Sequence, residues 1–434
     1  MLEHQSGNIR RLSRNRAEQV AYYRFLENEQ VTPSELSSTL SSHCQQQVSG
    51  KQVLALSDTT EINLQSHVGR LKSEGLGVVG NNRDVGFFLH PTLVLDGETG
   101  FPLGISAVQL WSRAAHRPSK KERKYSRLPI EQKESYKWVA SAERSTQSLI
   151  GGGATQVTHI GDRESDIYEV WQSVPQDDQH LLVRVQRDRR LGDASLYEVL
   201  ANQPVEGTYE VEILADARLG RQPRSAWLAV RFTAVTIQRP ANLSADAYEP
   251  SQTLWAIEAQ EISPPSDQAA IHWRLLTTHR VESVERALQM VLWYRWRWRI
   301  EQLFATIKLD GLDLESSQLE SVEAIQCLTV LGLSVALRIL QFVVGRDHPE
   351  LEATVALTQE QQVCLRSLGL TLNGKTKKQQ NPHRLLSLAW AVWLIARLGG
   401  WSGYSSQRPP GVLTLVQGWR RFEAIFLGWK LTQF

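Results

Sequence analysis

The sequence has little cysteine and almost no excess of charge of either sign. Three cysteines, Cys44, Cys327 and Cys364, stand far apart among 434 residues. Their odd number and wide spacing argue against a disulfide framework and against a zinc site, and they fit a reducing cytoplasm. The formal net charge is only +2. A surface that grips nucleic acid must therefore owe its positive charge to local clusters.

The N-terminus shows no signal-peptide pattern, and the chain shows no internal repeat or low-complexity segment. The most apolar run, Leu328 to Val344, is interrupted by Arg338, so we predict a buried helix rather than a membrane span. With 41% hydrophobic and 22% charged residues, the composition is that of an ordinary globular protein of two or three domains. We therefore expect a cytoplasmic protein.

Two predicted strands each lead directly to an aspartate. The apolar run from Val53 to Ser57 reads as a buried strand and is followed by Asp58. A short strand from Gln156 to Ile160 precedes Asp162, after which a helix begins. An aspartate in such a position can be only a turn residue or a helix N-cap. The same arrangement also presents a carboxylate at the edge of a sheet.

The neighbouring segments suggest how the two aspartates are related in space. Strands are predicted over Val85 to Leu95, Phe101 to Trp111 and His180 to Gln186, and a helix over Glu134 to Leu149. The order β-β-β-α-β-α-β is that of an α/β, ribonuclease-H-like fold with a mixed sheet. In that fold the first and fourth strands are parallel neighbours, so Asp58 and Asp162 are expected to meet.

The segment from Trp293 to Lys308 contains no glycine or proline and is predicted to form one helix. On a helical wheel its apolar residues share one side, and a polar stripe lies beside them. The stripe consists of Tyr294, Arg297, Glu301 and Lys308. A carboxylate flanked by phosphate-binding cations suits a metal-dependent site on nucleic acid. The alternative is an amphipathic helix with a solvated charged face.

The spacing of this stripe resembles the YREK signature of the insertion-sequence-four group of bacterial transposases, which includes the Tn-five transposase. The run from Asp162 to Tyr168 is similar to the motif around the second catalytic aspartate of that family. The resemblance extends over nearly the whole chain from Ala21 onward. It implies that Asp58, Asp162 and Glu301 form a DDE triad.

The resemblance implies a cut-and-paste DNA transposase acting on double-stranded DNA. Asp58, Asp162 and Glu301 would bind two Mg²⁺ ions, which Mn²⁺ can replace, in agreement with the preference of these metals for oxygen ligands. The implied reaction nicks the transposon end, passes through a DNA hairpin and joins the end to target DNA. The implied partners are the terminal inverted repeats, the target DNA and a second copy of the chain.

The same resemblance assigns DNA contacts. Tyr294, Arg297 and Lys308 would hold phosphates of the hairpin, and Trp273 aligns with a family tryptophan that occupies the place of a flipped base. A packing role for Trp273 is the alternative. Arg163 and basic clusters that include Arg184 would position the DNA backbone without reading sequence.

A strongly basic segment from Arg113 to Arg127 also reads as a phosphate-gripping loop, with a solvated loop as the alternative. Its basic residues are Arg113, Arg117, Lys120, Lys121, Arg123, Lys124 and Arg127.

These segments predict a division of the chain into four parts. Residues 1–50 form a short helical N-terminal DNA-binding remnant, and 51–194 with 279–345 form the ribonuclease-H-like catalytic core. Residues 195–278 form a β-rich insertion between the second aspartate and the glutamate. Residues 346–434 form a helical C-terminal region, for which the resemblance implies a dimer contact.

The N-terminal part motivates an alternative function. The segment from Ala21 to Leu26 resembles a family landmark that more chain usually precedes, and the extra chain helps to recognise transposon ends. Only twenty residues precede Ala21 here. The chain could therefore be an N-terminally short, non-catalytic transposition inhibitor that acts by dimerisation, or a general metal-dependent nuclease. Preference for one inverted repeat over random duplex at fixed salt separates these functions.

Overall fold

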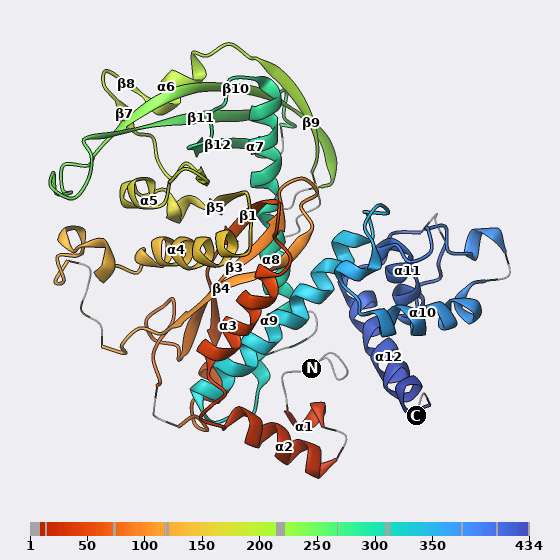
Figure 1. Ribbon diagram of the computed structural model, residues 1–434. Coiled ribbons are helices and arrows are strands. Elements are labelled where there is room, and N and C mark those ends of the chain that lie inside the picture. The colour runs from red at the N-terminus through yellow and green to blue at the C-terminus, as the bar shows by residue number, and fades with distance from the viewer. Residues whose placement is uncertain are drawn as a thin grey trace.

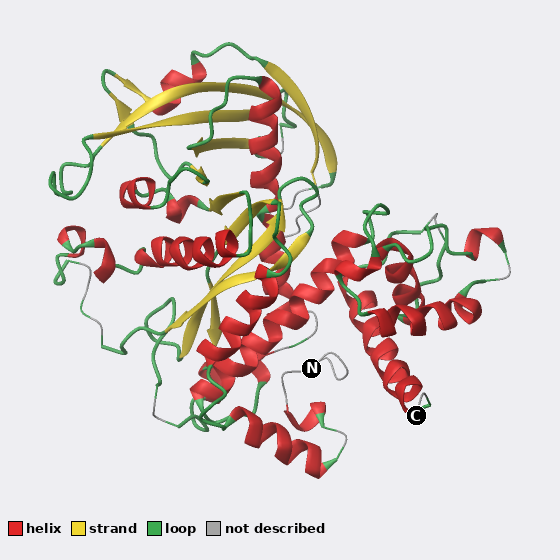
Figure 2. Cartoon of the chain, in the orientation of Figure 1, coloured by secondary structure: helices red, strands yellow, loops and turns green. Residues whose placement is uncertain are grey.

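The computed structural model describes residues 9–13, 15–72, 75–116, 118, 121–213, 222–266, 268–308, 312, 314–374, 376–404 and 407–432. These residues form a mixed α/β protein built around one ten-stranded sheet, with helices packed on both of its faces (Figures 1 and 2). A group of helices from the C-terminal part stands beside this body, connected to it through one long helix (Figure 1). The α/β class predicted from the sequence is confirmed.

Six strands form the first half of the sheet. They are β1 (Gln52–Ser57), β2 (Thr60–Asn63), β3 (Gly86–Asp96), β4 (Pro102–Trp111), β5 (Gln156–Gly161) and β6 (Gln179–Arg184). The strands β3 and β4 are antiparallel to their neighbours, whereas β1, β5 and β6 run parallel to one another. In the β1–β5 pair Leu56 lies opposite Ile160. Asp58 and Asp162 each follow two residues later, so the register brings them to the same end of the sheet at the same level.

The inserted strands continue this sheet. They are β9 (Gly207–Ile213), β10 (Arg224–Gln238), β11 (Ser251–Glu261) and β12 (His272–Thr277). Leu275 of β12 pairs with Arg184 of β6, and the order then runs outward through β11, β10 and β9. The predicted strands of residues 195–278 are therefore present. Their hydrogen bonds join them to the first half of the sheet, so the insertion shares its core. A short helix, α6 (Leu196–Ala201), and a two-stranded ribbon of β7 (Arg190–Leu191) and β8 (Ala194–Ser195) precede them.

Two sets of helices cover the sheet. One face carries α4 (Tyr136–Gly151) and α5 (Tyr168–Ser173), and the other carries α7 (Val284–Trp296), α8 (Trp298–Lys308) and α9 (Val322–Gly345). Among the described residues α9 alone is long and apolar enough to cross a membrane, but most of it is buried against other elements. It packs against β4, α8 and α11, which confirms the prediction of a buried core helix.

The prediction of one helix from Trp293 to Lys308 is wrong, because the helix is interrupted at Arg297. The amide of Arg297 donates to the carbonyl of Tyr294, and the amide of Ile300 donates to the carbonyl of Arg297, both at 3.1 Å. These bonds span three residues rather than four, so the chain tightens for one turn between α7 and α8. The predicted apolar side is nevertheless buried, with Trp293, Ile300 and Leu303 fully enclosed.

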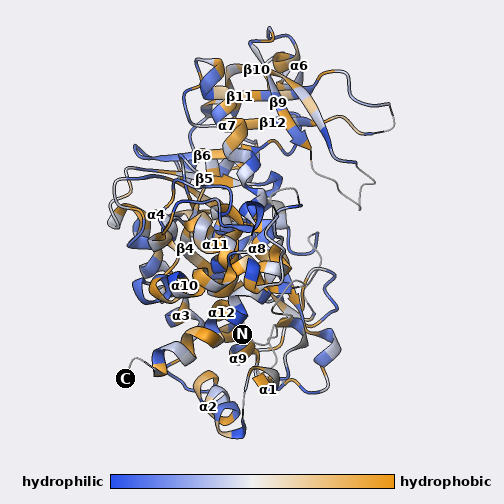
Figure 3. Cartoon of the chain, turned by 90° about the vertical axis from the view of Figure 1, so that its right-hand side faces the viewer, coloured by the Kyte–Doolittle hydropathy of each residue, from blue (hydrophilic) through white to orange (hydrophobic). Residues whose placement is uncertain are grey.

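Helices also form both ends of the described chain. At the N-terminal end, α1 (Ile9–Leu12), α2 (Arg16–Leu26) and α3 (Pro33–Gln45) agree with the predicted helical segment. At the C-terminal end lie α10 (Gln359–Leu372), α11 (Leu388–Leu398) and α12 (Val412–Leu431). The residues of α11 are almost all hydrophobic, and this helix lies near the middle of the view in Figure 3. It begins at Leu388, after Leu386 in a left-handed conformation, and Ser387 caps it by accepting a hydrogen bond from the amide of Trp390.

Gly104 brings α3 close to the edge strand β4. A methyl group at this position would stand 2.8 Å from the Cα atom of Cys44 in α3, closer than real side chains approach backbone. Cys44 is itself fully buried, so neither element has free space into which to move. This contact fixes the N-terminal helices to the sheet.

We expect Gly104→Ala to destabilise the protein by about 1–3 kcal/mol, because it overpacks this contact. Gly428→Ala is the matched control, since nothing lies within 4 Å of its added methyl group in the exposed part of α12. Thermal unfolding of the two variants measures the difference. If the two variants had equal melting temperatures, the contact between α3 and β4 would be able to accept a methyl group without a loss of stability.

Candidate active site

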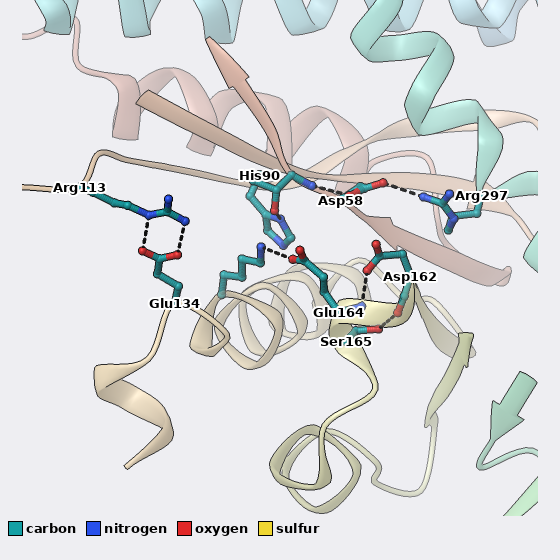
Figure 4. Close-up of polar contacts among 10 residues, drawn as sticks. Asp58, His90, Arg113, Glu134, Asp162, Glu164, Ser165 and Arg297 are labelled. Atoms are coloured by element: carbon teal, nitrogen blue, oxygen red, sulfur yellow. Dashed lines mark hydrogen bonds and ion pairs between the residues drawn. The ribbon is translucent and has the colours of Figure 1, made fainter. Parts of the chain in front are cut away.

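Asp58 follows β1, a strand that is buried from Val53 to Ser57. Its Oδ1 atom accepts a hydrogen bond from the amide of Thr59 at 2.7 Å, and 16% of its side chain is exposed. The hydroxyl of Thr59 lies 2.8 Å from Nδ1 of His90 on the neighbouring strand β3. The turn that carries the carboxylate is therefore held from both sides (Figure 4).

Asp162 follows β5 and caps the short 3-10 turn from Arg163 to Ser165. Its Oδ1 atom accepts from the amide of Glu164 at 2.8 Å, and its carbonyl accepts from the hydroxyl of Ser165 at 2.7 Å (Figure 4). The capping role considered for this aspartate is present. The capping hydrogen bond involves Oδ1 of Asp162. The side chain also faces the end of β1, beside Asp58 (Figure 4).

Arg297 joins the helical part of the site to the sheet. Its Nη1 atom lies 2.6 Å from Oδ2 of Asp58, and its Nη2 atom lies 3.5 Å from Oε1 of Glu301. Only 11% of the Arg297 side chain is exposed, compared with 41% for Glu301. Asp58 and Arg297 are 239 positions apart in sequence, so the fold brings together groups from distant segments.

The site concentrates negative charge. Burial raises the pKa of Asp58, and the charge of Glu301 raises it further, while Arg297 acts in the opposite direction. Burial also raises the pKa of Asp162, and the charge of Asp58 adds to this effect. Carboxylates that repel one another in a partly buried place are the groups that a divalent cation stabilises.

The donor atoms fit a hard divalent cation, because all three predicted ligands are carboxylates. Within the described ranges, however, no set of three or more His, Cys, Asp or Glu side chains is close enough together to hold a metal ion. The guanidinium of Arg297 lies between Asp58 and Glu301 and contacts both. These two carboxylates therefore do not face a common metal position. Metal binding by Asp58, Asp162 and Glu301 stays a prediction.

The residues predicted to contact DNA lie at different distances from these carboxylates. Tyr294 is buried with its ring centroid 6.0 Å from Cζ of Arg297, and the charge of Arg184 acts on its phenol. Lys308 is at the far end of α8, with Nζ 3.9 Å from Oε1 of Glu315. Arg163 is exposed.

Trp273 differs from these residues. It lies on β12, partly buried, and packs against the main core. Its packing role is therefore present, and its predicted role at a flipped base stays a prediction.

The basic clusters are partly used inside the protein. Arg113 binds both carboxylate oxygens of Glu134 at 2.6 Å and covers the ring of Phe88. Arg189 pairs with the fully buried Asp166. Arg117 and Lys120 lie outside the described residues, while Lys121, Lys124 and Arg127 are exposed. The exposed members are thus the ones that can meet phosphates.

A cation that the sequence motifs do not single out, Lys137, pairs with Glu164 in the turn after Asp162. Nζ of Lys137 lies 3.1 Å from Oε2 of Glu164, and only 12% of the Lys137 side chain is exposed. The same ammonium lies 5.8 Å from the ring centroid of Trp111 and 5.4 Å from that of Trp138. Lys137 sits in the first turn of α4, where no spacing in the sequence distinguishes it from an ordinary surface lysine.

A polar groove of about 1180 Å³ begins beside Lys137 and runs between α3, α4 and the free edge of β4. Three carboxylates and three cations line it, namely Glu131, Glu134, Glu323, Lys133, Lys137 and Arg144. Their charges balance, so the groove has no net attraction for an anion.

A comparison of the sequence with models of known protein families found no match.

Two neighbouring aspartates have opposite expected effects on stability. Because the pKa of Asp162 is raised in the folded protein, its ionised form opposes folding at neutral pH, and this effect fades as the pH falls through the raised pKa. We expect Asp162→Asn to keep or raise the melting temperature at neutral pH in chelator, with the difference from the native protein shrinking in mild acid.

Asp166→Asn is the matched comparison. Asp166 is fully buried and accepts bonds from Arg189, from Nε1 of Trp171 and from the amide of Gln186. Losing its charge leaves Arg189 without its partner, so we expect a loss of roughly 3–5 kcal/mol. If both substitutions lowered the melting temperature equally, Asp162 would be a structural residue.

Proposed function

We propose that this chain is a metal-dependent DNA transposase of the YREK-signature group, with a ribonuclease-H-like catalytic core. The observation that carries the proposal is the meeting of three separate segments at one end of the sheet. The parallel register of β1 and β5 aligns Asp58 with Asp162, and Arg297 links Glu301 to Asp58. These are the three positions that the sequence motifs single out.

The order of the strands supports the ribonuclease-H-like core. From the edge inward it runs β4, β3, β1, β5 and β6, with the first pairs antiparallel and the last two parallel. The helix α4 connects β4 to β5 across one face, as a crossover between parallel strands requires. The β insertion enters after β6 and before α7, between the second aspartate and the glutamate.

The chemistry follows from the donor set. Asp58, Asp162 and Glu301 would hold two divalent cations, which supply Lewis acidity and activate a water or a 3′-hydroxyl for in-line attack on a phosphodiester. Arg297 and Lys308 carry positive charge at either end of Glu301 on the α8 side, where they can bind phosphates on both sides of the reacting bond. No covalent enzyme intermediate is needed.

The remaining steps rest on the family resemblance. They comprise a nick at the transposon end, formation and opening of a hairpin, and joining to target DNA. Tyr294 would contact the hairpin beside Arg297, and Trp273 would take the place of a flipped base. Arg163 and Arg184 would position the backbone. The C-terminal helices α10, α11 and α12 would contact a second copy of the chain in the paired-end complex.

Strand cleavage on a duplex that carries the element's own terminal repeat and flanking DNA tests the proposal. We expect cutting at the repeat boundary with Mg²⁺ or Mn²⁺ and none with chelator. Cutting without regard to the repeat would indicate a general nuclease. Absence of cutting, together with association with a full-length relative, would indicate an inhibitor that acts by dimerisation.

Glu301→Gln tests the third carboxylate. We expect this variant to lose metal-dependent cleavage by about 10²-fold or more, because a neutral amide is a poor ligand for a hard cation. DNA binding at fixed salt is expected to stay near that of the native chain, since no cation is removed. Cleavage and gel-shift assays on the same duplex measure both. Retained cleavage would remove Glu301 from the site.

Lys308→Ala tests the phosphate contacts. Lys308 has a 25% exposed side chain and only a 3.9 Å ion pair with Glu315, so its loss is expected to change the melting temperature little. We expect slower processing of a pre-formed hairpin end, with intact folding. A fall in melting temperature as large as that expected for Asp166→Asn would make Lys308 a structural residue instead.

A further inference from the structure

Arg297 is the least expected member of the site, because it occupies the space between two predicted metal ligands. The break between α7 and α8 is at this residue, and its side chain reaches Asp58 at the end of β1. One guanidinium contacts Asp58 through Nη1 and Glu301 through Nη2. The guanidinium occupies the space between the two carboxylates. A metal ion bound by both carboxylates would need that same space, so the guanidinium and the metal ion exclude each other.

The contacts of Arg297 use only part of its hydrogen-bonding capacity. Its Nε atom is buried and has no hydrogen-bond partner within the described part of the chain. The contact with Glu301, at 3.5 Å, is at the limit of a hydrogen bond, and Glu301 is the more exposed carboxylate. A guanidinium binds best when two adjacent N–H groups meet two oxygens of one group. Arg297 has no such partner among the described residues.

A phosphate of bound DNA supplies that partner. It offers two oxygens to Nε and Nη together, and its charge replaces the one that Arg297 gives up by leaving Asp58. The guanidinium of Arg297 is close to the protein surface. Its Cζ atom lies 5.8 Å from the ring centroid of Trp298, a residue that is 58% exposed. Without DNA, the guanidinium instead offsets the repulsion among Asp58, Asp162 and Glu301.

We propose that Arg297 blocks the metal site in the DNA-free protein and that a DNA phosphate draws it away, so that divalent cations bind tightly only when DNA is present. The proposal rests on the proposed function, since it concerns the same carboxylates. It adds a coupling between two ligands. By thermodynamic linkage, DNA must tighten metal binding by the same factor by which the metal tightens DNA binding.

Binding of Mn²⁺ to the full chain, followed by the electron paramagnetic resonance signal of free Mn²⁺, tests this coupling without any turnover. In the absence of DNA we expect Arg297→Gln to bind Mn²⁺ about tenfold or more tightly than the native chain. Arg295→Gln is the matched control, because it removes a positive charge from α7 whose guanidinium contacts Tyr209. We expect that variant to stay close to the native affinity.

Adding Glu301→Gln to Arg297→Gln locates the bound ion. We expect the gain in Mn²⁺ affinity to disappear in the double variant. Equal Mn²⁺ affinity in the native chain and Arg297→Gln, or an equal gain in Arg295→Gln, would overturn the proposal. Circular dichroism and thermal unfolding confirm that each variant is folded.

The native chain provides a second measurement that needs no substitution. Its Mn²⁺ affinity is expected to rise about tenfold or more when a pre-cleaved terminal-repeat duplex is added. The rise is expected to be smaller with the same duplex carrying uncharged methylphosphonate linkages next to the cleaved end. Unchanged Mn²⁺ affinity with the native duplex would overturn the coupling.

These results are independent of whether the chain is a transposase. Metal-dependent cleavage at the repeat with no effect of Arg297→Gln on Mn²⁺ binding would leave the proposed function standing and refute the coupling. Tighter Mn²⁺ binding by Arg297→Gln without any cleavage by the native chain would refute the function and keep the blocking role.

Discussion

Repulsion among carboxylates that the fold forces together is the constraint on which this structure depends. The parallel pairing of β1 and β5 fixes the positions of Asp58 and Asp162 relative to each other, because each follows a buried strand in a fixed register. Burial raises the pKa of both; the charge of Glu301 adds to this effect at Asp58, and the charge of Asp58 adds to it at Asp162. A protein tolerates such a cluster only where something else compensates it. In the DNA-free chain that compensation comes from Arg297, whose charge lowers the pKa of both aspartates.

The rest of the architecture serves to hold these groups in place. Arg297, at the break between α7 and α8, contacts Asp58 at the end of β1 and Glu301 on α8, while the apolar side of both helices stays buried. The inserted strands extend the same sheet beyond β6 and carry Trp273 on β12. Thr59 and His90 fix the turn after β1. The carboxylates therefore follow or belong to regular helices and strands, whereas Arg297, which contacts Asp58 and Glu301, has a long side chain with several rotatable bonds.

Much of this could be predicted from the sequence because local pattern and burial agree. Buried strands before Asp58 and Asp162, the hairpin of β3 and β4, and the buried helix α9 follow from runs of apolar residues and turn residues. The interruption at Arg297 could not be predicted, since no glycine or proline marks it, and neither could the contact of Arg297 with Asp58 across 239 positions. The ion pair between Lys137 and Glu164 could not be predicted either. These two residues are distant in sequence and no periodicity links them.

The most direct measurement of the central claim is a crystal structure of the chain with a pre-cleaved DNA end and Mn²⁺, read from the anomalous scattering of the metal. The account predicts anomalous peaks about 2.0–2.4 Å from oxygens of Asp58, Asp162 and Glu301, as hard cations require. It also predicts the Arg297 guanidinium on a DNA phosphate. Anomalous peaks elsewhere, or none with Arg297 still between Asp58 and Glu301 on bound DNA, would contradict it.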